Sequence, residues 1–201
     1  SLGFLALIVI GTVLLSLPIA TIQPISILAA AFTATSAVTV TGLNVVDTAN
    51  YTTFGQLVIA ALIQFGGLGF MTFAILVLTS LQGKMGLSGS ITAQEALGTH
   101  SNQIGSTAKA VIKIAFITEG LGFLGLTLLL APLKGLKDAM YEAFFLCISA
   151  FNNAGFALNG NNMTAYVHQP MISFIISLLI ITGGIGFLVI LDIIKHKRWQ
   201  K

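Results

Sequence analysis

The chain has 201 residues, of which 56% are hydrophobic and only 7% carry a charge, against about 25% charged residues in a typical soluble domain. So few charges cannot cover the surface of a soluble protein of this size, and we therefore predict an all-α membrane protein. The net charge of +3 gathers beside one polar loop and at the end of the chain. That placement is typical of membrane flanks and argues against a nucleic-acid partner.

Four apolar stretches are long enough to cross a bilayer, because about 20 helical residues at about 1.5 Å each span a hydrocarbon core of about 30 Å. These predicted spans are residues 2–20, 54–81, 110–131 and 171–194. Between the members of each pair lies a shorter apolar stretch, 25–38 or 139–151. Its length suits a re-entrant helix that enters the membrane and turns back.

Polar residues predict where the two short helices begin. Ser26, after Pro24, precedes the first, and Asp138 is the predicted N-cap of the second, with Glu142 in its first turn. The single cysteine, Cys147, excludes an intrachain disulfide and a zinc cluster, and we expect it to be a small buried hydrophobic residue.

The placement of basic residues predicts the orientation of the spans. Seven basic residues gather at the polar loop and at the tail, and two lie on the opposite side: Lys84, Lys109, Lys113, Lys195, Lys197, Arg198 and Lys201 against Lys134 and Lys137. Basic residues favour the cytoplasmic side. We therefore predict cytoplasmic N- and C-termini in the cell membrane, and short helices that enter from outside.

A glycine-centred turn follows each short helix. The first lies in SAVTVTGLNV, residues 36–45, which has one glycine and no charge. Irregular backbone at membrane depth is tolerated only within protein or along a watery cavity. Carbonyl oxygens of such backbone can replace the hydration shell of a cation, and the C-terminal end of the short helix adds partial negative charge. The pattern predicts a pore loop.

The same pattern recurs in the second half of the chain. FTATSAVTVTGL aligns with FFLCISAFNNAGF, so that Gly155 lies 113 residues after Gly42. FGGLGF, residues 65–70, recurs as TGGIGF, residues 182–187. We therefore predict two tandem units, each a span, a pore helix, a filter turn and a second span, over residues 1–81 and 110–201, joined by a cytoplasmic loop over 82–109.

The motifs SAVTVTGLNVVDT, IQFGGLGFMTFAIL, SAFNNAGF and ITGGIGF resemble the Trk/Ktr/HKT superfamily of potassium transporters. The chain is most similar to the N-terminal half of the membrane subunit of a bacterial Ktr system. In that family four such units surround one pore, and each contributes a selectivity-filter turn with a key glycine. The resemblance implies potassium as the transported substrate, no cofactor and no enzymatic activity.

The resemblance also implies which residues bind the ion. Backbone carbonyls matching the two filter turns are those of Thr39, Val40, Thr41, Gly42, Asn152, Asn153, Ala154 and Gly155. Because this sequence holds two units, a second two-unit half is expected to complete the pore. The family further implies a dimer of complete subunits, contact with membrane lipid, and a cytosolic nucleotide-binding regulatory ring. Residues 91–98 could form a short helix that contacts such a ring.

Other residues keep two interpretations each. Asp47 follows the first turn and either concentrates cations at an outer mouth or caps nearby backbone. Glu119, inside the third predicted span, is either a hydrogen-bonded structural carboxylate or a proton-coupling group. Two glycine clusters are hinges or sites of close helix packing: Gly66, Gly67 and Gly69, and Gly183, Gly184 and Gly186.

Two functions other than a half-pore remain open from the sequence. A tandem channel with two pore units could close as a homodimer, although neither turn carries the two-glycine TVGYG pattern usual in such channels. A membrane scaffold without a pore would tolerate alanine at Gly42 and Gly155 without loss of any ion flux. An intramembrane enzyme is disfavoured because no GxSxG, HExxH or phosphate-binding motif occurs.

Overall fold

The structure is a computed structural model that describes residues 2–82, 102–160, 162–185 and 189. In these ranges the chain is all-helical, with one isolated β-bridge between Thr21 and Tyr51. The longer helices are α1 (Leu2–Leu15), α2 (Ile27–Thr39), α3 (Thr53–Gln82), α5 (Asn102–Lys134), α6 (Leu136–Phe151) and α7 (Pro170–Ile185). Two short 3₁₀-helices follow α2 and α6, namely η1 (Thr48–Asn50) and η2 (Asn162–Tyr166).

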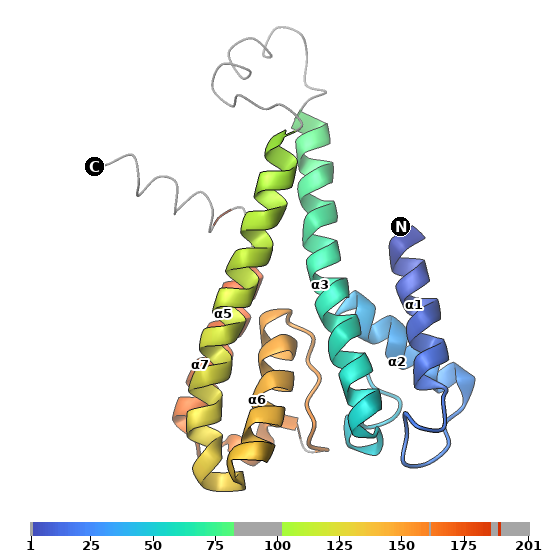
Figure 1. The fold of residues 1–201 in the computed structure, drawn as a ribbon, viewed down its shortest axis with the longest axis vertical. Coiled ribbons are helices and arrows are strands. Elements are labelled where there is room, and N and C mark those ends of the chain that lie inside the picture. The colour runs from blue at the N-terminus through green and yellow to red at the C-terminus, as the bar shows by residue number, and fades with distance from the viewer. Residues whose placement is uncertain (1, 83–101, 161, 186–188, 190–201) are drawn as a thin grey trace, which may run out of the picture.

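The helices form two groups of three (Figure 1). In the first half, α2 packs against α1 and α3, and in the second half α6 packs against α5 and α7. The long helices α3 and α5 approach each other at the top of Figure 1 and diverge below, and α6 lies in the space between them, in contact with α3. Each short helix is thus held among long ones.

Each half has its own apolar core. Leu15, Ile59 and Ile63 are buried around α2, and Leu126 and Leu130 are buried around α6. The outer faces are apolar as well, since large side chains on the long helices are exposed: Leu2, Val9, Phe116, Leu121, Leu128, Phe174 and Ile181. A helix that is apolar on its inner and outer faces fits a lipid environment better than water.

Among the described residues, one helical stretch, Ala110–Lys134, is long and apolar enough by length and composition to cross a bilayer. The other apolar stretches are shorter: Leu2–Leu15, Ile27–Thr39, Thr53–Gly69 and Pro170–Ile185. The helix of the first predicted span ends at Leu15, not at residue 20. The reason is Pro18, because the residue before a proline is disfavoured in helical conformation.

Two further boundaries differ from the prediction. Asp138 is not an N-cap: α6 begins at Leu136, and its N-cap is Gly135, at φ 85°, without a side-chain cap. Glycine adopts this left-handed angle readily, so α5 can turn directly into α6. Ser26, by contrast, is the N-cap of α2 as predicted, since its hydroxyl accepts a hydrogen bond of 3.2 Å from the amide of Ala29.

The helix α5 begins at Asn102, inside the segment that the sequence assigned to a loop, and continues past Pro132 to Lys134. The predicted short helix over residues 91–98 lies outside the described residues, as do the tail of the chain and Gly186. The predicted fourth span, 171–194, is represented by α7 as far as Ile185.

Candidate ion-binding site

The two predicted turns have the same backbone geometry. Residues 39–42 are called the first turn here, and residues 152–155 the second turn. In the first, the amides of Val40 and Thr41 donate to the carbonyls of Ala37 and Ser36, at 3.3 and 3.0 Å. In the second, the amides 113 positions later make the same pair of bonds to Ala150 and Ser149, at 3.1 and 2.7 Å. The sequence repeat therefore holds at the level of single hydrogen bonds.

Left-handed backbone follows at equivalent positions. Val40 and Asn153 have φ of 57° and 58°, and Gly42 and Gly155 both have φ of 73°. Glycine suits this angle and asparagine tolerates it, but a β-branched valine there is strained. Such strain persists only where the surrounding structure imposes it, and it is common at functional sites.

The two turns lie against each other. A Cβ atom added to Gly42 would lie 2.6 Å from the carbonyl oxygen of Ala154 and 3.3 Å from the Cα of Gly155. A Cβ added to Gly155 would lie 3.5 Å from the Cα of Gly42. Residues 113 positions apart in sequence thus form one locus in space, at the C-terminal ends of α2 and α6, where helix dipoles place partial negative charge.

The polar side chains of the turns are engaged by neighbouring protein. Thr39 donates to the carbonyl of Thr35 at 2.7 Å, and Thr41 donates to the hydroxyl of Ser36 at 3.1 Å. Asn152 donates to the carbonyl of Ile148 at 2.9 Å. In the part of the chain that the structure describes, no hydrogen bond reaches the carbonyl oxygens of residues 40–42 or 152–154. The carbonyl of Gly155, by contrast, accepts from Nδ2 of Asn162 at 3.5 Å, so among the described residues it is the carbonyls of residues 40–42 and 152–154 that lack a protein donor.

Glycines on α3 and α7 allow these helices to touch the ends of the short helices. A Cβ on Gly66 would collide with the carbonyl oxygen of Val38, and a Cβ on Gly183 would collide with that of Phe151. These are equivalent contacts in the two halves. Gly67 lies against the Asn152 side chain, whereas Gly69 and Gly184 have looser neighbours, at 3.6 and 3.7 Å.

Asp47 lies where the segments after the two turns meet. One of its carboxyl oxygens accepts from the amide of Ala49 at 3.1 Å and so caps η1, while the other faces Gly160. A polar pocket of about 250 Å³ lies beside it, lined by residues that follow both turns: Asn44, Asp47, Ala157, Asn159, Gly160 and Asn162. Asp47 thus caps η1 and also lies beside this pocket, so the two interpretations of the residue do not exclude each other.

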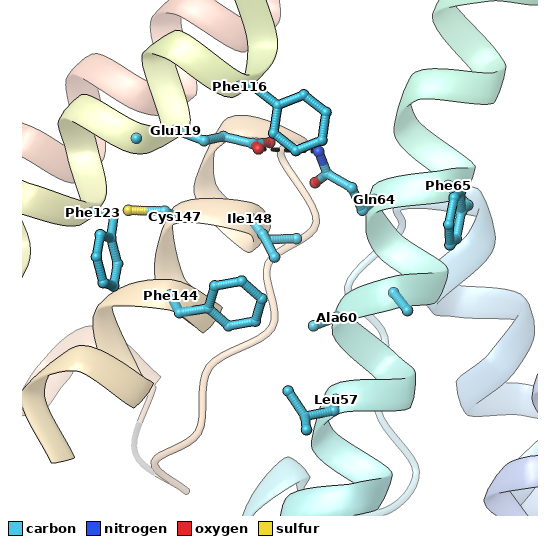
Figure 2. Close-up of a pocket in the computed structure, with 12 residues that line it drawn as sticks. Leu57, Ala60, Gln64, Phe65, Phe116, Glu119, Phe123, Phe144, Cys147 and Ile148 are labelled. Atoms are coloured by element: carbon cyan, nitrogen blue, oxygen red, sulfur yellow. Dashed lines mark hydrogen bonds between the residues drawn. The ribbon is translucent and has the colours of Figure 1, made fainter. Parts of the chain in front are cut away.

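A second cavity, of about 410 Å³, lies between α3, α5 and α6 (Figure 2). Its wall is mostly apolar and includes Cys147, which is buried. The polar groups are at one end, where Gln64 donates to Glu119 at 3.0 Å. Asn152 donates to Gln64 at 2.9 Å. Glu119 is therefore hydrogen-bonded to the first half of the chain and, through Gln64, to the second turn.

A polar cluster supporting the second turn was not found by sequence reasoning. Glu142, only 5% exposed, accepts from Lys134 at 2.6 Å, from Asn159 at 2.8 Å and from the hydroxyl of Tyr166. Burial first, and then the bond to Glu142, raises the pKa of Tyr166 above its ordinary value, so the hydroxyl remains a donor. The sequence signal was Glu142 itself, a carboxylate in an apolar helix.

Comparison with known proteins gives a consistent result. Residues 3–200 match the TrkH family, described as cation transport proteins. The chain is 46% identical over 203 residues to Ktr system potassium uptake protein B of Bacillus subtilis, an alignment covering 100% of this chain and 45% of that protein. For the protein of the same name in Vibrio alginolyticus, the identity is 40% over 202 residues, covering 100% and 44%.

A third relative is potassium/sodium uptake protein NtpJ of Enterococcus hirae, 36% identical over 205 residues, with 99% of this chain and 45% of that protein covered. The chain therefore spans about half the length of the curated relatives it matches. By name, these relatives are potassium or potassium/sodium uptake proteins. Because the family match runs along nearly the whole sequence, the chain belongs to the TrkH family of cation transport proteins.

Proposed function

We propose that this chain supplies two of the four units of a potassium pathway across the cell membrane. Each unit consists of a span, a pore helix, a filter turn and a second span. The first unit is residues 1–81, the second is residues 110–201, and residues 82–109 connect them on the cytoplasmic side. The helices α2 and α6 are the pore helices of this scheme.

The observation that carries the proposal is the contact between the two turns. Gly42 and Gly155 share a φ of 73°, and a Cβ added to Gly155 would be in van der Waals contact with the Cα of Gly42, although 113 residues separate them. Two turns of equal geometry that meet at their glycines support the proposal that they are half of a four-part ring. A scaffold without a pore gives no reason for this match, nor for the left-handed valine at position 40.

In the proposed mechanism, a dehydrated potassium ion is bound by backbone carbonyls of residues 39–42 and 152–155. Carbonyl oxygens replace its water shell without a fixed charge, so the ion can leave as well as enter. The C-terminal ends of α2 and α6 add a favourable potential for a cation. Asp47, beside the polar pocket at the end of both turns, raises the local cation concentration. Ions then move down their electrochemical gradient.

The family resemblance supplies the remaining partners of the proposal. A second two-unit half completes the ring, two complete subunits associate, and a cytosolic nucleotide-binding ring regulates the assembly. Both termini are proposed to lie in the cytoplasm. A tandem channel that closes as a homodimer is the competing arrangement, and it shares the same ion-binding carbonyls.

A chimaera tests the proposed ion path in a complete pore. This chain replaces the aligned segment of the Bacillus subtilis relative, and the chimaera is expressed in a host that lacks potassium uptake. We expect uptake with a preference for potassium over sodium, and we expect Gly42→Ser to weaken that preference because it alters the carbonyl geometry at a position of φ 73°. Gly120→Ala is the matched control, since a Cβ there meets nothing within 4 Å.

Equal potassium preference in the Gly42→Ser variant and in the control would contradict the assignment of the first turn as a filter. Loss of uptake in the unsubstituted chimaera, with the protein inserted in the membrane, would contradict the proposed function as a whole.

A further inference from the structure

We propose that Glu119 and Gln64 are positioning residues for the second turn, which they hold through the side chain of Asn152, and that they thereby contribute to the preference for potassium over sodium. This inference rests on the proposed function of the turns. It assigns a role to Glu119 that is neither proton coupling nor general packing.

The geometry is a chain of hydrogen bonds across three helices. The amide nitrogen of Gln64 on α3 donates to Oε2 of Glu119 on α5 at 3.0 Å. The amide oxygen of Gln64 accepts from Nδ2 of Asn152, at the end of α6, at 2.9 Å. Nδ2 also donates to the carbonyl of Ile148 at 2.9 Å and makes a longer contact of 3.5 Å with Oε1 of Glu119.

The carboxylate determines which way the Gln64 amide points. Both oxygens of Glu119 accept hydrogen bonds, Oε2 from Gln64 and Oε1 in the longer contact with Asn152, so the nitrogen of Gln64 faces Glu119 and its oxygen faces Asn152. That orientation presents an acceptor to Nδ2 and not a second donor. Without the carboxylate, the Gln64 amide could rotate and leave two donors opposed at the second turn.

Asn152 connects the Gln64 amide to the second turn. It is the C-cap of α6, and its backbone amide donates to the carbonyl of Ile148 at 3.1 Å. Its side-chain oxygen occupies the space that a Cβ on Gly67 would need. The side chain is thus held from α3 on one side and from its own helix on the other, and a change in its position moves the first carbonyl of the second turn.

The burial of Glu119 indicates that its role lies in the hydrogen bonds to Gln64 and Asn152. The residue is 7% exposed, and in the described part of the chain it makes no ion pair. A carboxyl group inside a membrane helix is unfavourable unless its oxygens are satisfied. Here the satisfying groups come from the first half and from the second turn, so the carboxyl group joins the two proposed units where the filter turns meet.

An exchange of the two side chains tests the inference with almost no change in volume. In the chimaera described above, Glu119→Gln and Gln64→Glu are made singly and together. Glu119→Gln removes the group that orients the amide, and Gln64→Glu places two carboxyl groups side by side. In the double variant, the carboxylate on α3 accepts from both neighbours, so the acceptor facing Asn152 is restored.

We expect each single substitution to lower the potassium-to-sodium uptake ratio about three- to ten-fold, the equivalent of one hydrogen bond. We expect the double variant to recover to within about two-fold of the parent. Thr127→Val, in the same helix as Glu119, is the control: it removes a buried hydroxyl that has no hydrogen-bond partner among the described residues, and it should leave the ratio unchanged.

Unchanged ratios in both single variants would overturn the inference and leave the proposed function standing. A double variant no better than the worse single variant would also overturn it, because the restored acceptor facing Asn152 would then have no effect on the ratio. A parent chimaera without potassium preference would overturn the proposed function first, and the inference with it.

Discussion

The two halves of the molecule build the same turn with different supporting contacts. Both halves place a serine hydroxyl against the residue after the turn: Ser36 accepts from the amide of Leu43 at 2.9 Å, and Ser149 donates to the carbonyl of Phe156 at 2.6 Å. The first half adds a bond between hydroxyl groups, from Tyr51 to Thr33 at 3.0 Å. In the second half, carboxyl groups dominate, with Glu142 bound by three donors and Glu119 connected to Asn152. The shared feature is the backbone: left-handed residues, glycine angles and helix ends.

This difference shows which features the proposed function requires. The hydrogen bonds of the turn backbone and the close approach of Gly66 and Gly183 are equal in both halves. Apart from the serines at positions 36 and 149, the side chains that hold the surrounding segments are not. We infer that carbonyl placement is the constrained property, whereas either hydroxyls or carboxylates can stabilise it, since each satisfies buried polar groups.

The largest effect is expected where the halves are equal. Gly66→Ala and Gly183→Ala each drive a Cβ into a backbone carbonyl, of Val38 or Phe151, which cannot move without displacing a turn. We expect each to destabilise the fold by about 3 kcal/mol or more. The measurement is the yield and thermal midpoint of detergent-solubilised protein, with Gly120→Ala as the control. Tolerance of alanine at only one position would break the equivalence of the halves.

The next effect separates the two kinds of support. Glu142→Ala leaves Lys134, Tyr166 and Asn159 without their shared acceptor, and we expect a loss of about 3 kcal/mol. Tyr51→Phe removes one buried hydrogen bond and should cost about 1 kcal/mol. Thermal midpoints of the two variants check this order. A larger loss for Tyr51→Phe would show that the hydroxyl support matters more than the ionic one.

A smaller effect concerns the two turn glycines. Both have φ of 73°, but a Cβ on Gly42 comes within 2.6 Å of Ala154, whereas a Cβ on Gly155 remains 3.5 Å from Gly42. We therefore expect Gly42→Ala to reduce potassium uptake by the chimaera about ten-fold more than Gly155→Ala, equivalent to about 1.4 kcal/mol. Initial uptake rates, normalised to membrane-inserted protein, test this. Equal losses of uptake in the two variants would mean that backbone strain at φ 73°, and not the contact with Ala154, determines the effect.

The smallest effect compares the left-handed residues before the glycines. Val40 at φ 57° is strained, and Asn153 at φ 58° is not. Val40→Asn should therefore raise the free energy of unfolding by about 1 kcal/mol, and Asn153→Val should lower it by about 1 kcal/mol. Thermal midpoints of both variants, compared with that of the parent protein, test these two changes. Opposite signs would show that side-chain packing outweighs the backbone at these positions.

The sequence predicted the features that depend on local pattern. Hydrophobic runs located the helices, and the repeat of glycines placed the two turns in register, which the hydrogen bonds of Val40 and Asn153 match. Ser26 was recognisable as an N-cap because capping depends on neighbours three residues away. Whether the turns bind potassium remains a prediction.

The features that the sequence missed depend on contacts between distant residues. Gln64 and Asn152 are 88 positions apart, and Gln64 and Glu119 are 55 apart, so no periodicity reveals their bonds. The start of α6 was mistaken because Gly135 was not recognised as a helix cap, and Asp138 has the residue type that usually caps. Tertiary packing decided the bonds of Gln64, whereas the local backbone angle of Gly135 decided the start of α6.

The most direct test of the central claim is potassium uptake in a host that lacks it. The chain is expressed alone, and together with a two-unit half taken from the part of the Bacillus subtilis relative outside the alignment. We predict uptake only when both are present, because the chain is proposed to supply two of four units. Uptake by the chain alone would contradict the half-pore and favour a homodimer. No uptake in either case, with inserted and folded protein, would contradict transport.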